Sequence, residues 1–242
     1  FYRLGQKSVG GQVFTDRVLT EVTSIIDRFV TVSRNMNVLK IIAFGTSALR
    51  EASNSNELIK LIFARTGINV EIISGETEAA CAGKGILLGF PNSQGVICDL
   101  GGNSVEFATI FEGKVKNCQT ALLGPLAVNK LFGMKSDVRN QMKTVLEKMN
   151  IAEHNDLRKK LFLIGGSWRA IAKFHMDLTG YPIKIIQGYK IKAKALKRTL
   201  SLIHSEKGKK ILSKTNITIE RLELLPHSVT LLEMILETYK FD

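Results

Sequence analysis

The segment that most constrains the fold covers residues 96–107, where an apolar stretch is interrupted by Asp99, a glycine pair and Ser104. Apolar residues on both sides of such an interruption are typical of two buried strands joined by a turn. A buried strand does not require an acid at its end, or two glycines that bring backbone N–H groups close to a ligand. The segment therefore fits two interpretations: a hairpin that holds phosphate and metal, or an ordinary hairpin with a polar turn.

Composition places the chain among folded globular proteins. Its 242 residues are 45% hydrophobic, which suits one large domain or two small ones. No apolar run reaches the roughly 18 residues that span a bilayer, and residues 1–5 lack the charged-then-apolar layout of a signal peptide. We therefore expect a cytoplasmic protein that does not enter a membrane.

The charge balance indicates the kind of partner. The chain has 34 lysines and arginines against 22 acids, a formal net charge of +12, which favours a polyanionic partner. Nucleic acid is not expected, because Trp168 and four tyrosines are few stacking residues and no recognised nucleic-acid module is present. The alternative is a basic surface that is simply solvated.

Cysteines and histidines form no recognised disulfide or zinc pattern. Cys81, Cys98 and Cys118 are odd in number, widely spaced and set among apolar residues, which predicts small core side chains. No two histidines are spaced by four residues with an acid between them, so a histidine metal site is not expected. The histidines are His154, His175, His204 and His227.

Residues 15–73 alternate between helical and strand patterns. A strand, a helix and a second strand with short links predict a right-handed crossover and parallel pairing. The expected segments are a helix over 15–35 that Thr15 caps and that covers a sheet, a buried strand over 38–44, a helix begun by Asn54 or Ser55 with Glu57 in a capping box and ended by Gly67, and a strand over 70–73.

A second α/β pattern begins after residue 74. Small residues in a helix from 75 to about 89 permit close packing, which places that helix at a domain junction. Lysines and arginines over 190–198 either guide a long anion or line a solvated helix face. The other expected segments are strands over 96–100, 105–110, 115–122 and 160–164, a helix over 168–178, and C-terminal helices that include 228–239.

Three loops rich in glycine or hydroxyl side chains each follow an expected strand, where α/β folds gather ligand sites. The segment that begins the helix near residue 74 is a fourth motif. In their order along the chain, the four motifs resemble the motifs of the Ppx/GppA family of exopolyphosphatases and guanosine pentaphosphate phosphohydrolases. Together they are more specific than any one alone. The motifs are residues 46–54, 73–79, 99–106 and 165–170.

The resemblance implies an α/β protein of the actin-like, ribonuclease-H-like ATPase superfamily, with two α/β domains and a cleft between them. It also implies hydrolysis of a terminal phosphoanhydride bond by water with Mg²⁺. We expect a partial N-terminal domain over 1–81 and a second domain with C-terminal helices over 82–242. Phosphoryl transfer requires a cation, donors around the phosphoryl group and a carboxylate that orients water, and the chain has candidates for each.

Three acids carry the chemistry that the resemblance implies. Glu78 aligns with the catalytic glutamate and would orient or deprotonate the attacking water; the alternative is an acid favoured at a helix N-terminus. Asp99 would hold Mg²⁺ directly or through water, with Glu106 as a second acid at the same site. The alternatives are a strand-end turn for Asp99 and a solvent-facing strand position for Glu106.

Nine residues would bind phosphate if the resemblance holds. The alternative role for Arg50 is a structural ion pair with a helix acid. The alternative role for the loop 165–167 is a simple helix cap. The nine are Ser47 and Arg50 from one domain, Gly101, Gly102, Asn103 and Ser104 from the hairpin loop, and Gly165, Gly166 and Ser167 toward the polyphosphate or nucleotide end.

The chain departs from the family pattern in three ways. Family members begin with an Asp-x-Gly-Ser-Asn-Ser loop that forms the first phosphate clamp, and none precedes Phe1. The chain lacks an initiating Met and stops before a Gly-Leu-Arg-Glu-Gly segment, so we expect an interior piece of a longer protein. Asn103 replaces a third glycine, and asparagine tolerates left-handed dihedrals better than most residues.

These observations predict a Mg²⁺-dependent hydrolase that releases orthophosphate from the end of inorganic polyphosphate. Guanosine pentaphosphate is the alternative substrate for the same chemistry. A second alternative is a fragment that binds polyphosphate without hydrolysing it, and a third is a sugar-kinase-like phosphotransferase, which the segment 74–79 disfavours. The protein could also form a homodimer, which the sequence leaves open.

Overall fold

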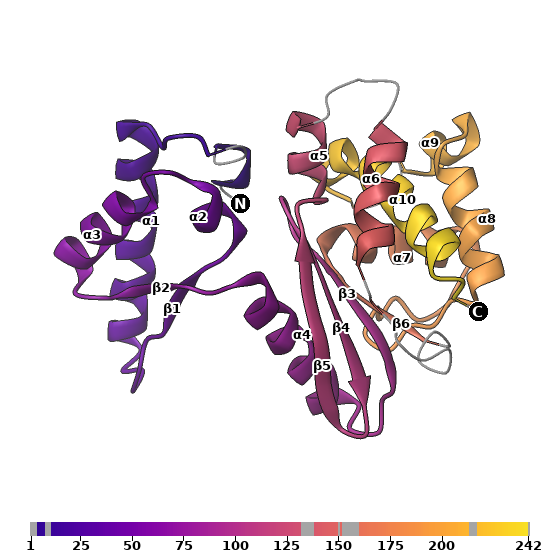
Figure 1. The fold of residues 1–242 in the computed structure, drawn as a ribbon, viewed down its shortest axis with the longest axis horizontal. Helices are drawn as coiled ribbons and strands as arrows, with labels where there is room; N and C mark the ends of the chain where they lie inside the picture. Colours follow the sequence, from indigo (N-terminus) through magenta and orange to yellow (C-terminus); the bar gives the residue numbers. More distant parts are fainter. Residues whose placement is uncertain are drawn as a thin grey trace. The chain divides into compact units, whose positions relative to one another are not determined.

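The computed structural model describes residues 4–7, 11–131, 138–149, 151, 160–212 and 217–241. The chain forms two compact units, Phe1–Glu78 and Ala79–Asp242, and each is described by itself (Figure 1). The division falls inside helix α4 (Gly75–Gly89). The first unit contains the short 3₁₀ helix η1 (Leu4–Lys7), α1 (Asp16–Asn35), β1 (Ala43–Gly45), α2 (Ser47–Glu51), α3 (Ser55–Thr66) and β2 (Val70–Ile72).

Two helices form the core of the first unit. Thr15 caps α1 as expected, since its hydroxyl accepts a hydrogen bond from the Val18 N–H. Gly67 ends α3 with φ of 70°, a left-handed conformation that glycine adopts at little cost. The two helices pack through a small apolar cluster whose buried members are Phe14, Val18, Leu19, Ala52, Leu58 and Ile62.

Asn54 links the two helices in a way that the expected capping box does not describe. Its side chain accepts a hydrogen bond from the Phe14 N–H at 2.8 Å and donates to the Phe14 carbonyl at 3.0 Å. It also donates to Glu57 Oε2 at 3.0 Å, but it makes no cap bond to an α3 backbone N–H. Asn54 therefore joins the segment before α1 to the start of α3.

The sheet of the first unit has two described strands, β1 and β2, and they pair in parallel with Ala43 opposite Val70. The predicted parallel pairing is confirmed, but the prediction of a buried strand over 38–44 is wrong. The strand begins only at Ala43, and Ile42 and Phe44 are 71% and 60% exposed. Helix α1, which was expected to cover this sheet, packs mainly against α3.

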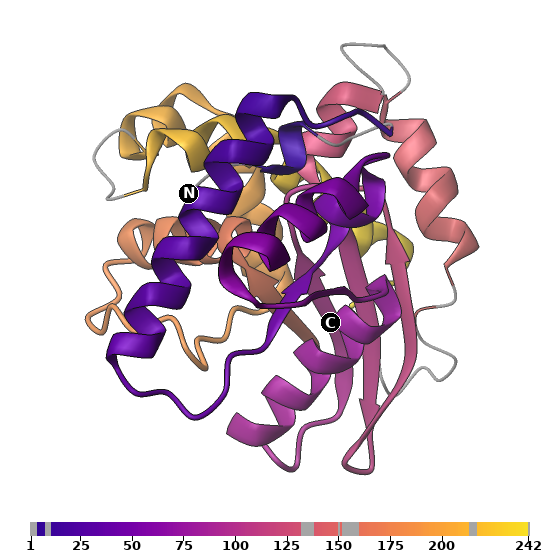
Figure 2. The same ribbon diagram turned by 90° about the vertical axis from the view of Figure 1, so that its left-hand side faces the viewer.

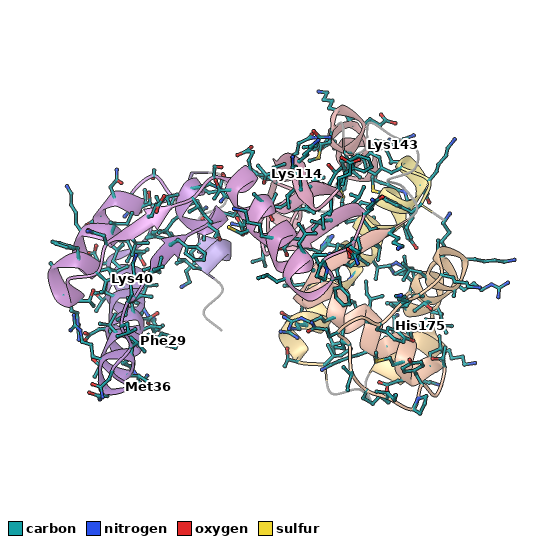
Figure 3. All side chains as sticks on the ribbon, turned by 90° about the horizontal axis from the view of Figure 1, so that it is seen from below. Phe29, Met36, Lys40, Lys114, Lys143 and His175 are labelled. Atoms are coloured by element: carbon teal, nitrogen blue, oxygen red, sulfur yellow. The ribbon has the colours of Figure 1, made fainter. Side chains whose placement is uncertain are left out.

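The apolar arc of α1 is wider than the surface it packs against. Val18 and Val30 are buried, whereas Phe29, an apolar residue at the same helical spacing, is 68% exposed. Met36 continues the exposed side, and both labelled side chains lie at the surface in Figure 3. Helical spacing therefore locates the apolar arc correctly but not which part of it is covered.

The second unit is built on one four-stranded sheet with the order β5-β4-β3-β6. Neighbours β3–β4 and β4–β5 are antiparallel, and β3–β6 are parallel. Glu112 and Gly113 join β4 to β5 with φ of 49° and 69°, which suits the twist of a two-residue hairpin turn. The strands are β3 (Gly95–Leu100), β4 (Val105–Phe111), β5 (Lys114–Ala121) and β6 (Leu161–Gly165).

Helices cover both faces of this sheet. Helix α4 lies on one face, where Ile97, Ala108 and Ile110 are buried against it, and the C-terminal helices pack on the other (Figures 1 and 2). Gly83 allows the close approach of α4, since an added Cβ would lie 2.6 Å from Val115 Cγ1. The helices of the second face are α5 (Pro125–Leu131), α6 (Val138–Lys148), α7 (Gly166–Leu178), α8 (Ala193–Ile203), α9 (Glu206–Leu212) and α10 (Ile219–Thr238).

Two expectations for the second unit need correction. Helix α10 begins at Ile219 instead of residue 228 and continues through Pro226, because Leu225 and Val229 on either side of the proline are both buried in the core. Cys81 is exposed, whereas Cys98 is buried as expected and Cys118 is half-buried. Within the described residues, no helix combines the length and the apolar character needed to cross a membrane.

Candidate active site

The hairpin of β3 and β4 brings two acids face to face. Asp99 and Glu106 are direct partners across the antiparallel pair, so their side chains lie on the same face of the sheet. This is the α4 face, since Ile97 and Ala108 lie two residues away on each strand. Like charges directly opposite each other are unfavourable. A cation between the two carboxylates would remove that cost.

Glu106 is buried, which excludes the solvent-facing alternative for it. It is 1% exposed, and its Oε1 accepts a hydrogen bond from Thr120 Oγ1 of β5 at 3.0 Å. The charges of Asp99 and Glu106 also act on the neighbouring thiol. Burial, and then these two carboxylates, raise the pKa of Cys98 well above its usual range. Asp99, Glu106 and Cys98 are therefore close together.

The loop between the strands consists of two exposed glycines and two buried polar residues. Asn103 and Ser104 are each 2% exposed, and the Gly101 N–H donates to the Ser104 carbonyl at 3.0 Å. None of these four residues has a positive φ, so Asn103 does not use the left-handed tolerance expected of it. Gly102 lies close to the first turn of α5, since an added Cβ would lie 2.9 Å from Leu126 Cδ1 at the tip of that side chain.

A second loop ends beside the first at the same edge of the sheet. Gly165 of β6 lies opposite Leu100 of β3 in the parallel pair, so the loops that follow these strands are neighbours. Gly165 has φ of 125°, and an added Cβ would lie 2.5 Å from the Leu100 carbonyl oxygen. It is also the N-cap of α7, without a side-chain cap bond. The backbone conformation and the close approach to Leu100 therefore require glycine at position 165.

Arg221 is a residue of this region that sequence inspection missed. A Cβ built on Gly166 would lie 3.5 Å from Arg221 Nε, so the guanidinium stands over the loop 165–167. Ser167, the next residue, is half-buried in the first turn of α7. A guanidinium beside backbone N–H groups suits an anion. No spacing in the sequence signals Arg221, because it lies 55 residues from Gly166.

The first unit contains Ser47, Arg50 and Glu78. Arg50 Nη1 donates to Glu78 Oε2 at 3.1 Å and to the Ile73 carbonyl at 2.9 Å. The side chains of Arg50 and Glu78 are 19% and 22% exposed. The structure therefore shows Arg50 in an ion pair with a helix acid, which was the alternative to phosphate binding. Glu78 lies in the first turn of α4, where the helix dipole also favours an acid.

Ser47 and the start of α4 complete the polar groups of this unit. Ser47 is 7% exposed, and its hydroxyl has no hydrogen-bond partner within the described part of the chain. A buried hydroxyl without a partner is costly, which fits a group that meets a ligand. Ser74 Oγ accepts a hydrogen bond from the Thr77 N–H and so caps α4. Bonds from its own backbone N–H and from Ser74 lower the pKa of Glu76.

Few side chains in the described part of the chain are placed to bind a cation. Among the residues that the structure describes, no three His, Cys, Asp or Glu side chains cluster as a metal site, and His154 lies outside these residues. The Asp99–Glu106 pair is the remaining candidate. Mg²⁺ is typically bound by one or two carboxylates, with water and phosphate oxygens completing the octahedron. The hard oxygen donors and the opposed charges therefore fit Mg²⁺.

Known proteins with a similar sequence are longer than this chain. Retrograde regulation protein 2 of Saccharomyces cerevisiae is 27% identical over 193 residues, which is 71% of this chain and 33% of that protein. Exopolyphosphatase 1 of Mycobacterium tuberculosis is 28% identical over 131 residues, which is 53% of this chain and 37% of that protein. The chain thus spans about a third of the length of these relatives.

The fold has also been seen in a solved structure. An exopolyphosphatase from Cytophaga hutchinsonii superposes with a TM-score of 0.75 at 22% identity, over 95% of this chain and 77% of that one. The α/β fold class predicted from the sequence is confirmed. A family model described as "Ppx/GppA phosphatase family" matches residues 1–241 of the chain. The chain is therefore a member of the Ppx/GppA phosphatase family.

Proposed function

We propose that the protein hydrolyses the terminal phosphoanhydride bond of inorganic polyphosphate and releases orthophosphate. The observation that carries this proposal is the directly opposed pair Asp99 and Glu106, which lies beside the glycine loop at the end of β3. Membership of a phosphatase family and the exopolyphosphatases among the relatives support it. The net charge of +12 favours a polyanion over a small neutral substrate.

Asp99 and Glu106 would hold Mg²⁺ in this proposal. When bound, the ion neutralises negative charge on the phosphate oxygens of the substrate. Thr120 fixes one oxygen of Glu106 by its hydrogen bond, and burial prevents water from screening that carboxylate. The glycine loop provides backbone N–H groups for the phosphoryl oxygens, and Arg221 provides a guanidinium beside Gly166.

Glu78 would orient the attacking water or accept its proton. Arg50 holds Glu78 Oε2 and is itself fixed by the Ile73 carbonyl, so the carboxylate has a defined direction. A carboxylate held in place loses little freedom when it takes up a water molecule. In this proposal Arg50 acts on the reaction through Glu78, as a positioning residue.

The first prediction tests the role of Glu78. Purified wild-type chain should release phosphate from tripolyphosphate with added MgCl₂ and stop releasing it with EDTA. Glu78→Gln should lower kcat by about 10²–10⁴, because it removes a general base while keeping the shape of the side chain. The matched control is Glu76→Gln, an exposed acid in the same helical turn, which should stay within a few-fold of wild type.

The outcomes separate the candidate functions. Turnover of Glu78→Gln within a few-fold of wild type contradicts the assignment of Glu78. Competition between polyphosphate and guanosine pentaphosphate in one assay decides which substrate has the higher kcat/KM. Mg²⁺-independent binding of polyphosphate with no turnover by wild type would favour the binding alternative instead. The metal, the homodimer and the cytoplasmic location stay predictions.

A further inference from the structure

The backbone of the hairpin loop is held by residues 124–126, where the connection from β5 meets the first turn of α5. The Leu126 N–H donates to the Gly102 carbonyl at 2.8 Å, and the Gly124 N–H donates to the Asn103 carbonyl at 2.9 Å. We call Gly124 and Leu126 the loop clasp. Both residues belong to the same unit as the loop, and neither stands out in the sequence as a site residue.

These two hydrogen bonds set the direction of two backbone N–H groups. In a trans peptide the carbonyl and the N–H of the next residue point in opposite directions. The Gly102 carbonyl and the Asn103 N–H share one peptide plane, and the Asn103 carbonyl and the Ser104 N–H share the next. Because both carbonyls point toward the clasp, the N–H groups of Asn103 and Ser104 point away from it.

Gly124 has no room for a side chain. An added Cβ would lie 2.5 Å from the Gly102 oxygen and 2.6 Å from the Asn103 nitrogen, and it would also meet the Asn103 carbonyl carbon. All three atoms belong to the backbone of the loop, so the loop itself would have to move. Gly102 differs, because its added Cβ would meet only the tip of the Leu126 side chain.

We propose that Gly124 is a positioning residue for phosphate binding: by clasping the Gly102–Asn103 backbone, it holds the glycine loop in the conformation in which the loop binds the phosphoryl oxygens of the substrate. This inference rests on the proposed function, since it names how the same loop recognises a phosphate group. It assigns the β5–α5 connection to the site, which the motif 99–106 does not include.

The test compares Gly124→Ala with Gly85→Ala in the full chain. Gly85 lies in α4 with open space around its added Cβ, so its substitution is a matched control. Tripolyphosphate affinity is measured by calorimetry with MgCl₂, and backbone amide signals by ¹H–¹⁵N NMR. Gly124→Ala should weaken binding about tenfold or more, as expected when bonds to a charged group are misaligned, while Gly85→Ala binds as wild type does.

The NMR spectra separate a positioning role from general loss of structure. In Gly124→Ala, the amide signals of residues 101–104 should shift before ligand is added and respond weakly to tripolyphosphate, while signals of α7 and α10 stay in place. A folded Gly124→Ala protein with wild-type affinity and wild-type amide shifts overturns the inference. Wild-type protein that does not bind tripolyphosphate overturns the proposed function instead.

A second measurement applies if Gly124→Ala does not fold. Hydrogen exchange of the wild-type protein is followed by NMR at the amides of Gly124 and Leu126, whose bonds to the loop should protect them from exchange. Added tripolyphosphate should increase that protection. Exchange of both amides at the rate of an unstructured peptide contradicts the clasp.

Discussion

Cys98 shows how strongly one residue's surroundings determine its chemistry. It stands next to Asp99 in the sequence, yet its side chain lies on the opposite face of the strand, in the main apolar core. Burial and the nearby carboxylates of Asp99 and Glu106 raise the pKa of its thiol well above the usual range. The thiolate is the reactive form of cysteine, so Cys98 should be inert in the folded chain.

Alkylation with iodoacetamide tests this prediction at pH 8. Exposed Cys81 should be modified first, and Cys98 should be modified only on the time scale of unfolding. Mass spectrometry of tryptic peptides at successive times gives both rates. Labelling in urea, where all three cysteines should react alike, is the control. Modification of native Cys98 as fast as Cys81 would show that the thiol is not buried as described.

At the scale of elements, the first unit depends on one side chain that bridges two helices. Asn54 makes three hydrogen bonds, two with the Phe14 backbone before α1 and one with Glu57 in α3. Asn54→Ala should therefore lower the free energy of unfolding by about 1–3 kcal/mol, since each such bond contributes about 1 kcal/mol at most sites. Urea unfolding followed by circular dichroism measures the change.

The neighbouring Asn56 is the control for that substitution. It is exposed in the same helix, and alanine is the better helix former, so Asn56→Ala should change the free energy of unfolding by no more than about 0.5 kcal/mol. Similar effects of the two substitutions would mean that the bonds of Asn54 to Phe14 add nothing to stability.

At the scale of the whole molecule, two histidines make stability depend on pH. Burial lowers the pKa of His175 and of His227 below the usual histidine range. The Nδ1 atom of His175 also lies 2.6 Å from the Tyr189 hydroxyl oxygen. The folded chain therefore binds fewer protons than the unfolded chain just below the ordinary histidine pKa of about 6.5. Stability should fall as pH drops through that region.

The measurement is the unfolding midpoint in urea between about pH 7.5 and 5, above the range of most carboxylates. Wild type should lose stability toward the acidic end, and His175→Asn should lose less, because asparagine can still bond Tyr189 but takes up no proton. The two proteins are compared by the slope of the unfolding midpoint against pH, since asparagine also changes the stability by a constant amount at every pH. Parallel slopes for the two proteins would rule out a contribution from His175.

The sequence by itself determines the features that depend on near neighbours in the chain. The loop length between two apolar runs places Asp99 opposite Glu106, and cap residues such as Thr15 and Gly67 mark helix ends correctly. Periodicity and turn chemistry act over a few residues, so a single chain segment is enough to predict them. The family motifs belong to this class, because each is a short local string.

Only the tertiary structure decides which faces are covered and which distant residues meet. Burial excludes the solvent-facing alternative for Glu106, and it leaves Ile42 and Phe44 exposed on a strand predicted to be buried, because burial depends on what packs on a face and not on the pattern of the face itself. The contacts of Gly124 with the glycine loop and of Arg221 with Gly166 join segments that are far apart in the chain. Such contacts leave no periodic signal, since they arise from the packing of whole elements.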